Sequence, residues 1–134
     1  MKRLHFSILT MGTLALGIIA TEAKPVQLTA DQIGVIEQTI RSLLKDQTNV
    51  TFGKPGATTT STGSIIVCGR YYAKSGFAGY SGETAYRGQF DSADSGTKYL
   101  PAFDILTMPE NQSETDDLIK RCASLGVDVP PIGN

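Results

Sequence analysis

The side chains that most often carry out acid–base catalysis are scarce in this chain of 134 residues. Its one histidine is His5, so residues 24–134 contain none. Ser-His-Asp triads, Cys-His pairs and histidine-containing zinc sites all need an imidazole. We therefore expect residues 24–134 to have no enzymatic activity, no bound metal and no cofactor.

Carboxylates remain as candidates for catalysis, because glycoside hydrolysis needs only two acidic side chains a few ångströms apart. Four acidic residues lie on or beside a predicted hairpin, and their spacing singles out no pair: Glu83, Asp91, Asp94 and Asp104. A small histidine-free enzyme that uses such carboxylates is therefore an alternative function. The segment 91–96 also offers oxygen ligands for calcium, but it lacks the register of an EF-hand, which favours a plain turn.

The glycine-rich segment 74–82 is the strongest candidate for a binding site. Its glycines recur every three residues and permit tight turns: Gly76, Gly79 and Gly82. Phe77 and Tyr80 lie between these glycines. Basic side chains flank the segment: Arg70, Lys74 and Arg87. Aromatic and arginine side chains on a loop are typical anchors of interfaces. The alternative is that the two aromatic side chains fold back into the core.

Residues 1–23 have the pattern of a cleavable secretory signal. Lys2 and Arg3 precede an apolar run over 4–20, and small residues stand at positions −3 and −1 of a cleavage site after Ala23. As a helix the apolar run spans about 25 Å, which is short of the roughly 30 Å of a bilayer core. We therefore expect residues 24–134 to form a single exported domain, periplasmic or secreted, with no membrane span.

Two cysteines, Cys68 and Cys122, are predicted to form a disulfide. An even number of cysteines in an exported chain indicates a bridge, and the chain has no CxxC spacing to support a metal site. A reactive thiol is the alternative. The bridge closes a loop of 55 residues. By the chain-entropy estimate, a loop of this length stabilises the fold by about 4 kcal/mol.

Hydrophobic periodicity predicts a helix at each end of the exported chain. The first covers residues 28–47, with a capping box at Thr29 and Gln32. Its apolar stripe is Ile33, Ile36, Ile40, Leu43 and Leu44. The second begins near Ser113 and stops at Gly126.

Between the helices, alternating and β-branched segments predict strands over 49–52, 64–73, 83–90 and 99–108. The Gly/Thr/Pro-rich segment 53–63 is predicted to be a surface loop. The fold class is therefore α+β. An N-terminal amphipathic helix packs on a three- or four-stranded antiparallel sheet, and the disulfide ties a short C-terminal helix to that sheet.

Two segments together support a resemblance. KDQTNVTF (45–52) and VCGRYYAKSGFAGYSG (67–82) resemble the motifs KDPxSAxF and VCGxxNAKNxFGGYxG of a group of small exported bacterial proteins of uncharacterised function. Glutamine stands here where that group has proline, and Tyr72 and Ser75 stand where it has asparagine. The resemblance implies an exported bacterial α+β protein and implies no activity.

The function expected from these features is that of an exported, non-enzymatic module. Its partner is a protein or an envelope component, bound through the hairpin segment 74–82. Loss of two basic residues and one acidic residue with the signal changes the net charge from −1 to −2, so no nucleic-acid partner is expected. Besides the histidine-free enzyme, a purely structural periplasmic protein is the other alternative to this function.

Overall fold

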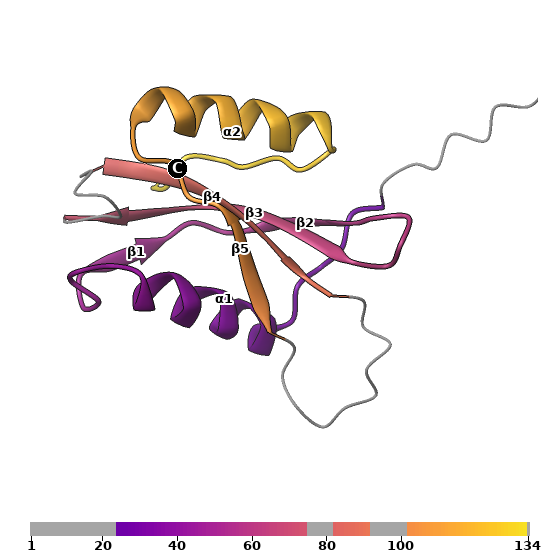
Figure 1. Cartoon of the computed structure of the whole chain (residues 1–134), viewed down its shortest axis with the longest axis horizontal. Helices are drawn as coiled ribbons and strands as arrows, with labels where there is room; N and C mark the ends of the chain where they lie inside the picture. Colours follow the sequence, from indigo (N-terminus) through magenta and orange to yellow (C-terminus); the bar gives the residue numbers. More distant parts are fainter. Residues whose placement is uncertain (1–23, 75–81, 92–101, 134) are drawn as a thin grey trace, which may run out of the picture.

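Two helices enclose an antiparallel β-sheet, one helix on each face (Figure 1). This computed structural model describes residues 24–74, 82–91 and 102–133. In chain order the elements are α1 (Ala30–Ser42), β1 (Val50–Phe52), β2 (Gly56–Thr59), β3 (Ile65–Ala73), β4 (Gly82–Phe90), β5 (Phe103–Thr107) and α2 (Gln112–Ser124). The predicted α+β class is confirmed.

The sheet has five strands in the order β1-β3-β4-β5, with β2 also paired to β3. The central strand is β3, because β1 pairs with its last three residues and β2 with its first four. The sequence predicts three or four strands. This number is wrong, because β2 lies inside the segment 53–63 that is predicted to be a surface loop.

The strand β2 forms because the chain supplies a partner on each side of it. On one side β2 pairs with β3. On the other, the Val26 amide donates to the Ala57 carbonyl at 3.0 Å and the Thr59 amide donates to the Lys24 carbonyl at 3.1 Å. Ala57 and Thr58 are buried as a result. The β-branched threonines favour this pairing. The glycines and prolines around them are typical of loops, so the sequence pattern does not predict a strand here.

Helix α1 begins at the predicted capping box, in which Thr29 Oγ1 accepts from the Gln32 amide and Gln32 Oε1 accepts from the Thr29 amide. The helix ends at Ser42, earlier than the predicted Gln47. The sheet-facing stripe is Ile36, Ile40 and Leu44, all buried. Leu43 is 45% exposed, so its predicted place in the stripe is wrong: the helix ends at Ser42, and the turn that follows buries Leu44 in place of Leu43.

Helix α2 begins at Gln112, with Asn111 as its N-cap. The Asn111 side chain accepts from the Glu114 amide at 3.0 Å. The helix thus starts near Ser113 as predicted, but Asn111 and not Ser113 is its cap, since Asn111 satisfies an amide of the first turn. Gly126, at φ +80°, follows the end of the helix as predicted.

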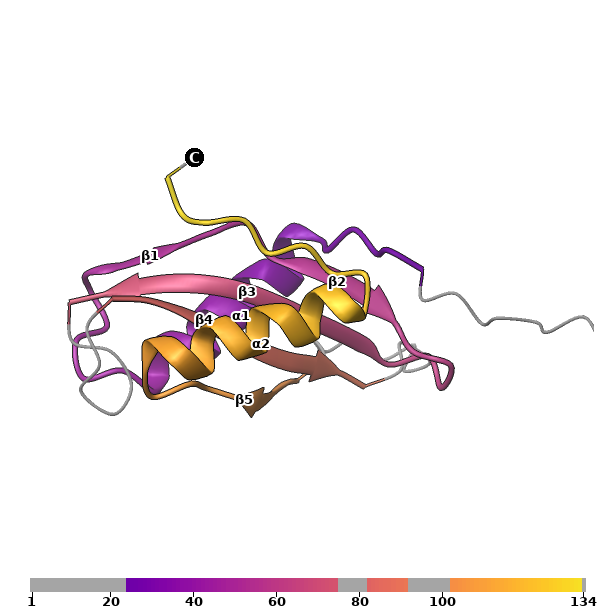
Figure 2. The same ribbon diagram turned by 90° about the horizontal axis from the view of Figure 1, so that it is seen from above.

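The disulfide ties α2 to the middle of β3. Cys68 and Cys122 are bonded, with their Cα atoms 6.4 Å apart, which confirms the predicted bridge. After Gly126 the chain turns back and runs beside α2 over the same face of the sheet (Figure 2). Val127 and Val129 are buried in this returning segment.

The other strand predictions hold within the described residues. The segments 49–52, 64–73 and 83–90 correspond to β1, β3 and β4. The strand predicted over 99–108 is described over Phe103–Thr107, at the edge of the sheet. Its pairing with β4 shifts register between Arg87 and Gly88. An edge position or a bulge is what Pro101 leads one to expect.

Candidate functional site

The part of the binding hairpin that the structure describes is its stem. Ala73 pairs with Gly82 where β3 ends and β4 begins. Gly82 has φ +151°, a conformation that residues with a side chain rarely adopt. Four residues of the predicted site lie outside the described residues: Gly76, Phe77, Gly79 and Tyr80.

Tyr72 carries the exposed aromatic ring of this stem. It is 48% exposed. The other aromatic residues of the described ranges are buried or half-buried: Phe52, Tyr71, Tyr86, Phe90 and Phe103. In the register of the sheet Tyr72 lies between Thr51 of β1 and Glu83 of β4. Because its strand is paired on both sides, the ring stands on a rigid support.

Three segments that are distant in sequence meet at this end of the fold. Figures 1 and 2 both place the end of β3 and the start of β4 near the loop from α1 to β1 and near the start of α2. Lys74 is exposed there, as are Thr51 and Asn111. The surface made by Thr51, Tyr72 and Lys74 is called the hairpin-stem surface below.

The sequence analysis gives Tyr72 no role, although a signal for it exists. Successive side chains of a strand point to opposite faces. Tyr71 and Tyr72 are adjacent in a strand, so one of them has to face away from the α1 core. Tyr71 is the buried one, at 0% exposed. Tyr72 shares its face with Cys68 and Arg70, and its ring is exposed there.

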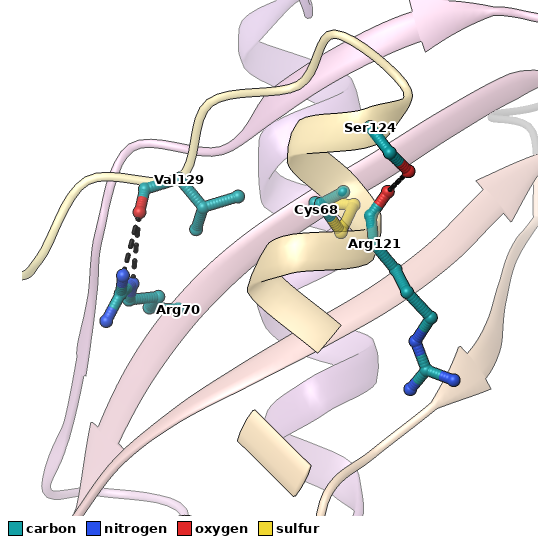
Figure 3. Close-up of a disulfide and its surroundings, with 6 residues drawn as sticks. Cys68, Arg70, Arg121, Ser124 and Val129 are labelled. Atoms are coloured by element: carbon teal, nitrogen blue, oxygen red, sulfur yellow. Dashed lines mark hydrogen bonds between the residues drawn. A yellow bond between two sulfur atoms is a disulfide. The ribbon is translucent and has the colours of Figure 1, made fainter. Parts of the chain in front are cut away.

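Arg70 of the predicted binding set holds the C-terminal segment. Its Nε and one terminal nitrogen donate to the Val129 carbonyl at 3.2 and 2.9 Å. Figure 3 shows these two bonds beside the disulfide at Cys68. The other terminal nitrogen pairs with Glu83 Oε1 at 3.2 Å. The same carboxylate oxygen accepts from the Ile132 amide at 3.0 Å. Arg70 is therefore engaged within the fold, with its side chain 14% exposed.

Arg87 of the same set lies away from the hairpin end. It pairs with Cys68 in the register of the sheet. Arg87 is five positions along β4 from Gly82, a distance of about 17 Å at about 3.4 Å per residue. Its Nε is buried without a hydrogen-bond partner among the described residues. The structure thus brings Lys74 to the hairpin end with Tyr72, and it does not bring Arg87 there.

The segment 45–52, which carries the first of the two resembling motifs, has a structural role in the turn before β1. Asp46 accepts hydrogen bonds from the Thr48 hydroxyl at 2.7 Å, from the Thr48 amide at 3.0 Å and from Asn49 Nδ2 at 3.1 Å. These bonds lower the pKa of Asp46 from 3.8 to about 2. Phe52 then packs beside Tyr71, with ring centroids 6.5 Å apart, and the Arg41 guanidinium lies 4.9 Å above the Phe52 ring.

The Cys68-Gly69 pair also has a structural explanation, which uses both faces of the sheet. Cys68 points toward α2 and forms the disulfide. Gly69 points to the opposite face, where the ring of Tyr86, its partner on β4, lies directly against it. Burial at this place raises the pKa of the Tyr86 phenol. Neither residue is available to a ligand.

Glu83 does not lie within catalytic distance of Asp104. Asp104 pairs with Gln89, six residues along β4 from Glu83. That separation is about 20 Å, whereas glycosidase carboxylates lie about 5–9.5 Å apart. Asp91 and Asp104 lie toward the other end of β4 and are both exposed. Asp94 is outside the described residues.

One hollow lies beside the N-terminal segment, with a volume of about 510 Å³. Its lining is Pro25, Val26, Gln27, Leu28, Ile33, Lys54 and Pro55. Lys54 is the single charged residue of that lining, so the hollow contains no acid–base pair. Across the described ranges there is no group of three or more acidic, histidine or cysteine side chains that could hold a metal ion.

Within residues 24–74, 82–91 and 102–133, neither helix is long and apolar enough to cross a membrane. Comparison of the chain with protein-family models, with curated proteins and with solved structures finds no match. The case for a functional site therefore depends on the geometry of the described residues. Among them, the hairpin-stem surface combines an exposed aromatic ring, an exposed cation and a rigid support.

Proposed function

We propose that the protein is an exported, non-enzymatic module that binds a protein or an envelope component through its β3–β4 hairpin. The observation that carries this proposal is the exposure of Tyr72 on a strand paired on both sides. Tyrosine is enriched at the centres of interfaces, because its large ring loses little conformational entropy on binding and its hydroxyl can form a hydrogen bond.

The composition around Tyr72 favours a partner with both apolar and polar groups. Lys74 adds a cation beyond the end of the strand, and Thr51 adds a hydroxyl on the neighbouring strand. The Glu83 carboxylate next to Tyr72 is neutralised by Arg70. Phe77 and Tyr80 continue the same chain segment and stay part of the proposed binding hairpin.

Export is supported by two features. The chain begins with the pattern of a cleavable signal over residues 1–23. The disulfide is of the kind that persists in oxidising compartments and is rare in the cytosol. The proposal accordingly locates the protein in the periplasm or outside the cell, as for the small exported bacterial proteins whose motifs its two segments resemble.

The test uses a photo-crosslinking amino acid, p-benzoylphenylalanine, in place of Thr51, in living cells that express the chain with its own signal. Position 51 is exposed and faces Tyr72 in the register. Three forms are compared: the reporter alone, the reporter with Tyr72→Ala, and the reporter with Leu106→Ala. Leu106 is a matched control, since it is also 48% exposed but lies on β5, at the opposite edge of the sheet.

We expect a discrete adduct that Leu106→Ala leaves intact and Tyr72→Ala reduces at least tenfold. A contact worth about 1.4 kcal/mol gives a change of that size. An adduct equally strong in all three forms, or no adduct in any form, contradicts binding through the hairpin stem. Non-reducing electrophoresis checks that each variant has formed its disulfide.

A further inference from the structure

The two faces of the sheet differ in what they bury. Toward α1 the sheet buries six large apolar side chains, Ile65, Val67, Tyr71, Tyr86, Phe90 and Phe103, together with the smaller Ala57, Ala73 and Thr84. Toward α2 the apolar side chains of the sheet are few and mostly small: Ile66, Cys68 and Ala85. Alternation along the strands places polar residues on this second face: Arg70, Glu83, Arg87, Gln89 and Asp104. The second face can therefore meet water at little cost.

The larger core is complete without the C-terminal part of the chain. Every member of that core, including its partly buried neighbours, lies between Val26 and Met108. The pairing of all five strands lies within residues 50–107. We define the C-terminal layer as α2 with residues 125–133. This layer contributes no side chain to the larger core.

The C-terminal layer has few apolar attachments of its own. From α2 the buried residues are Thr115, Leu118 and Cys122, and Thr115 Oγ1 has no hydrogen-bond partner among the described residues. Val127 and Val129 add to the contact, and the partly buried Ile119 and Leu125 pack against it. One of the helix's two buried apolar residues is thus a cysteine whose contribution depends on its bond to Cys68. Most other side chains of α2 are exposed, with four acidic or basic residues after its first turn: Asp116, Asp117, Lys120 and Arg121.

We propose that the Cys68–Cys122 disulfide is a redox latch for this layer. When the bond is intact, α2 and the returning segment cover the polar face of the sheet. A dithiol reductant passes two electrons to the bond, which opens to two protein thiols as the reductant closes to its own disulfide. The C-terminal layer then leaves the sheet, while α1 and the five strands stay folded. In the oxidised form both cysteines are at most 1% exposed, so a reductant reaches the bond only after local opening.

Hydrogen exchange followed by mass spectrometry tests the latch on the full folded chain. The oxidised protein is compared with protein reduced by dithiothreitol and with the variant Cys68→Ala/Cys122→Ala. Alkylation counts the thiols, so that the redox state of each sample is known. We expect amide protection in α2 to fall on the order of a thousandfold when the bond is absent, as the chain-entropy estimate for its loop implies. Protection in α1 and in the β3–β4 pair changes less than tenfold.

Trypsin gives a second readout on the same samples. Lys120 and Arg121 lie in α2, whereas Arg41 lies in α1 and Arg87 in β4. We expect the cuts that appear only after loss of the disulfide to occur at Lys120 and Arg121, with Arg41 and Arg87 resistant. In the oxidised protein all four sites resist.

Two results overturn the proposal. Equal loss of protection in α1, the sheet and α2 shows that the chain unfolds as one unit and that the disulfide has no local role. Unchanged protection of α2 in the Cys68→Ala/Cys122→Ala variant shows that packing alone holds the layer. If dithiothreitol fails to open the buried bond, the variant decides between these outcomes.

Discussion

The substitution Gly69→Ala tests the packing of the central strand most directly. A Cβ on Gly69 would lie 2.5 Å from Tyr86 Cζ, and real Cβ atoms essentially never come within 3.0 Å of another heavy atom. Tyr86 is 1% exposed, so its ring has no free space to move into. Overpacking of a buried site costs about 1–3 kcal/mol. We therefore expect Gly69→Ala to lower the free energy of unfolding by about 2 kcal/mol, even after the smaller entropic gain of replacing glycine.

The assay is urea unfolding at neutral pH, followed by circular dichroism, with the disulfide intact. A matched control is Gly34→Ala in α1, where a Cβ meets nothing within 4 Å. Because alanine favours a helix over glycine by about 1 kcal/mol, this control should raise the stability. Replacing glycine by alanine should then lower the free energy of unfolding at position 69 and raise it at position 34. An unchanged or increased stability of Gly69→Ala refutes the reasoning, whatever the control shows.

Three further predictions follow from the same contacts. Arg70→Ala should lower the free energy of unfolding by about 2–3 kcal/mol, because it removes two charge-assisted bonds to Val129 and leaves that carbonyl unpaired; urea unfolding and hydrogen exchange of the C-terminal segment measure it. The Asp46 carboxyl should titrate near pH 2 when followed by NMR. Because its pKa in the folded state lies below the unfolded value of 3.8, its contribution to stability is present above pH 4 and is lost as the pH falls through about 2. Asp46→Asn should remove that part of the pH dependence of stability. Asn111→Ala should cost about 1 kcal/mol as the loss of a helix cap, whereas Ser113→Ala should stay within about 0.5 kcal/mol of the parent in thermal unfolding.

Local signals predict the elements that satisfy themselves along the chain. The capping box at Thr29 closes within three residues, so its letters alone identify the start of α1. Gly126 ends α2 by its own left-handed conformation. The disulfide joins residues 54 apart and is predicted on another ground, the even count of cysteines in a chain with the pattern of an export signal.

Features that depend on a distant partner are not visible in the sequence. The strand β2 is stabilised by the carbonyl of Lys24 and by β3, and no pattern within residues 53–63 predicts either partner. Likewise Arg70 has the appearance of a surface cation for binding, and its engagement by Val129 depends on the path of a segment 59 residues away. The exposure of Tyr72 depends in the same way on how far the other layers extend over the sheet.

The Cys68-Gly69 pair shows how one stretch of β3 serves both layers of the fold. Consecutive residues of a strand face opposite layers, so the cysteine can hold α2 while the glycine admits the Tyr86 ring on the α1 side. Two residues further, Tyr71 and Tyr72 repeat the division: one ring is buried and the other is exposed. A double-mutant cycle between Gly69→Ala and Tyr86→Leu measures how far the Tyr86 ring limits the residue at position 69. A smaller side chain at position 86 should recover at least 0.5 kcal/mol of the stability lost in Gly69→Ala. Additive effects of the two substitutions would mean that the ring does not decide which residue position 69 can hold.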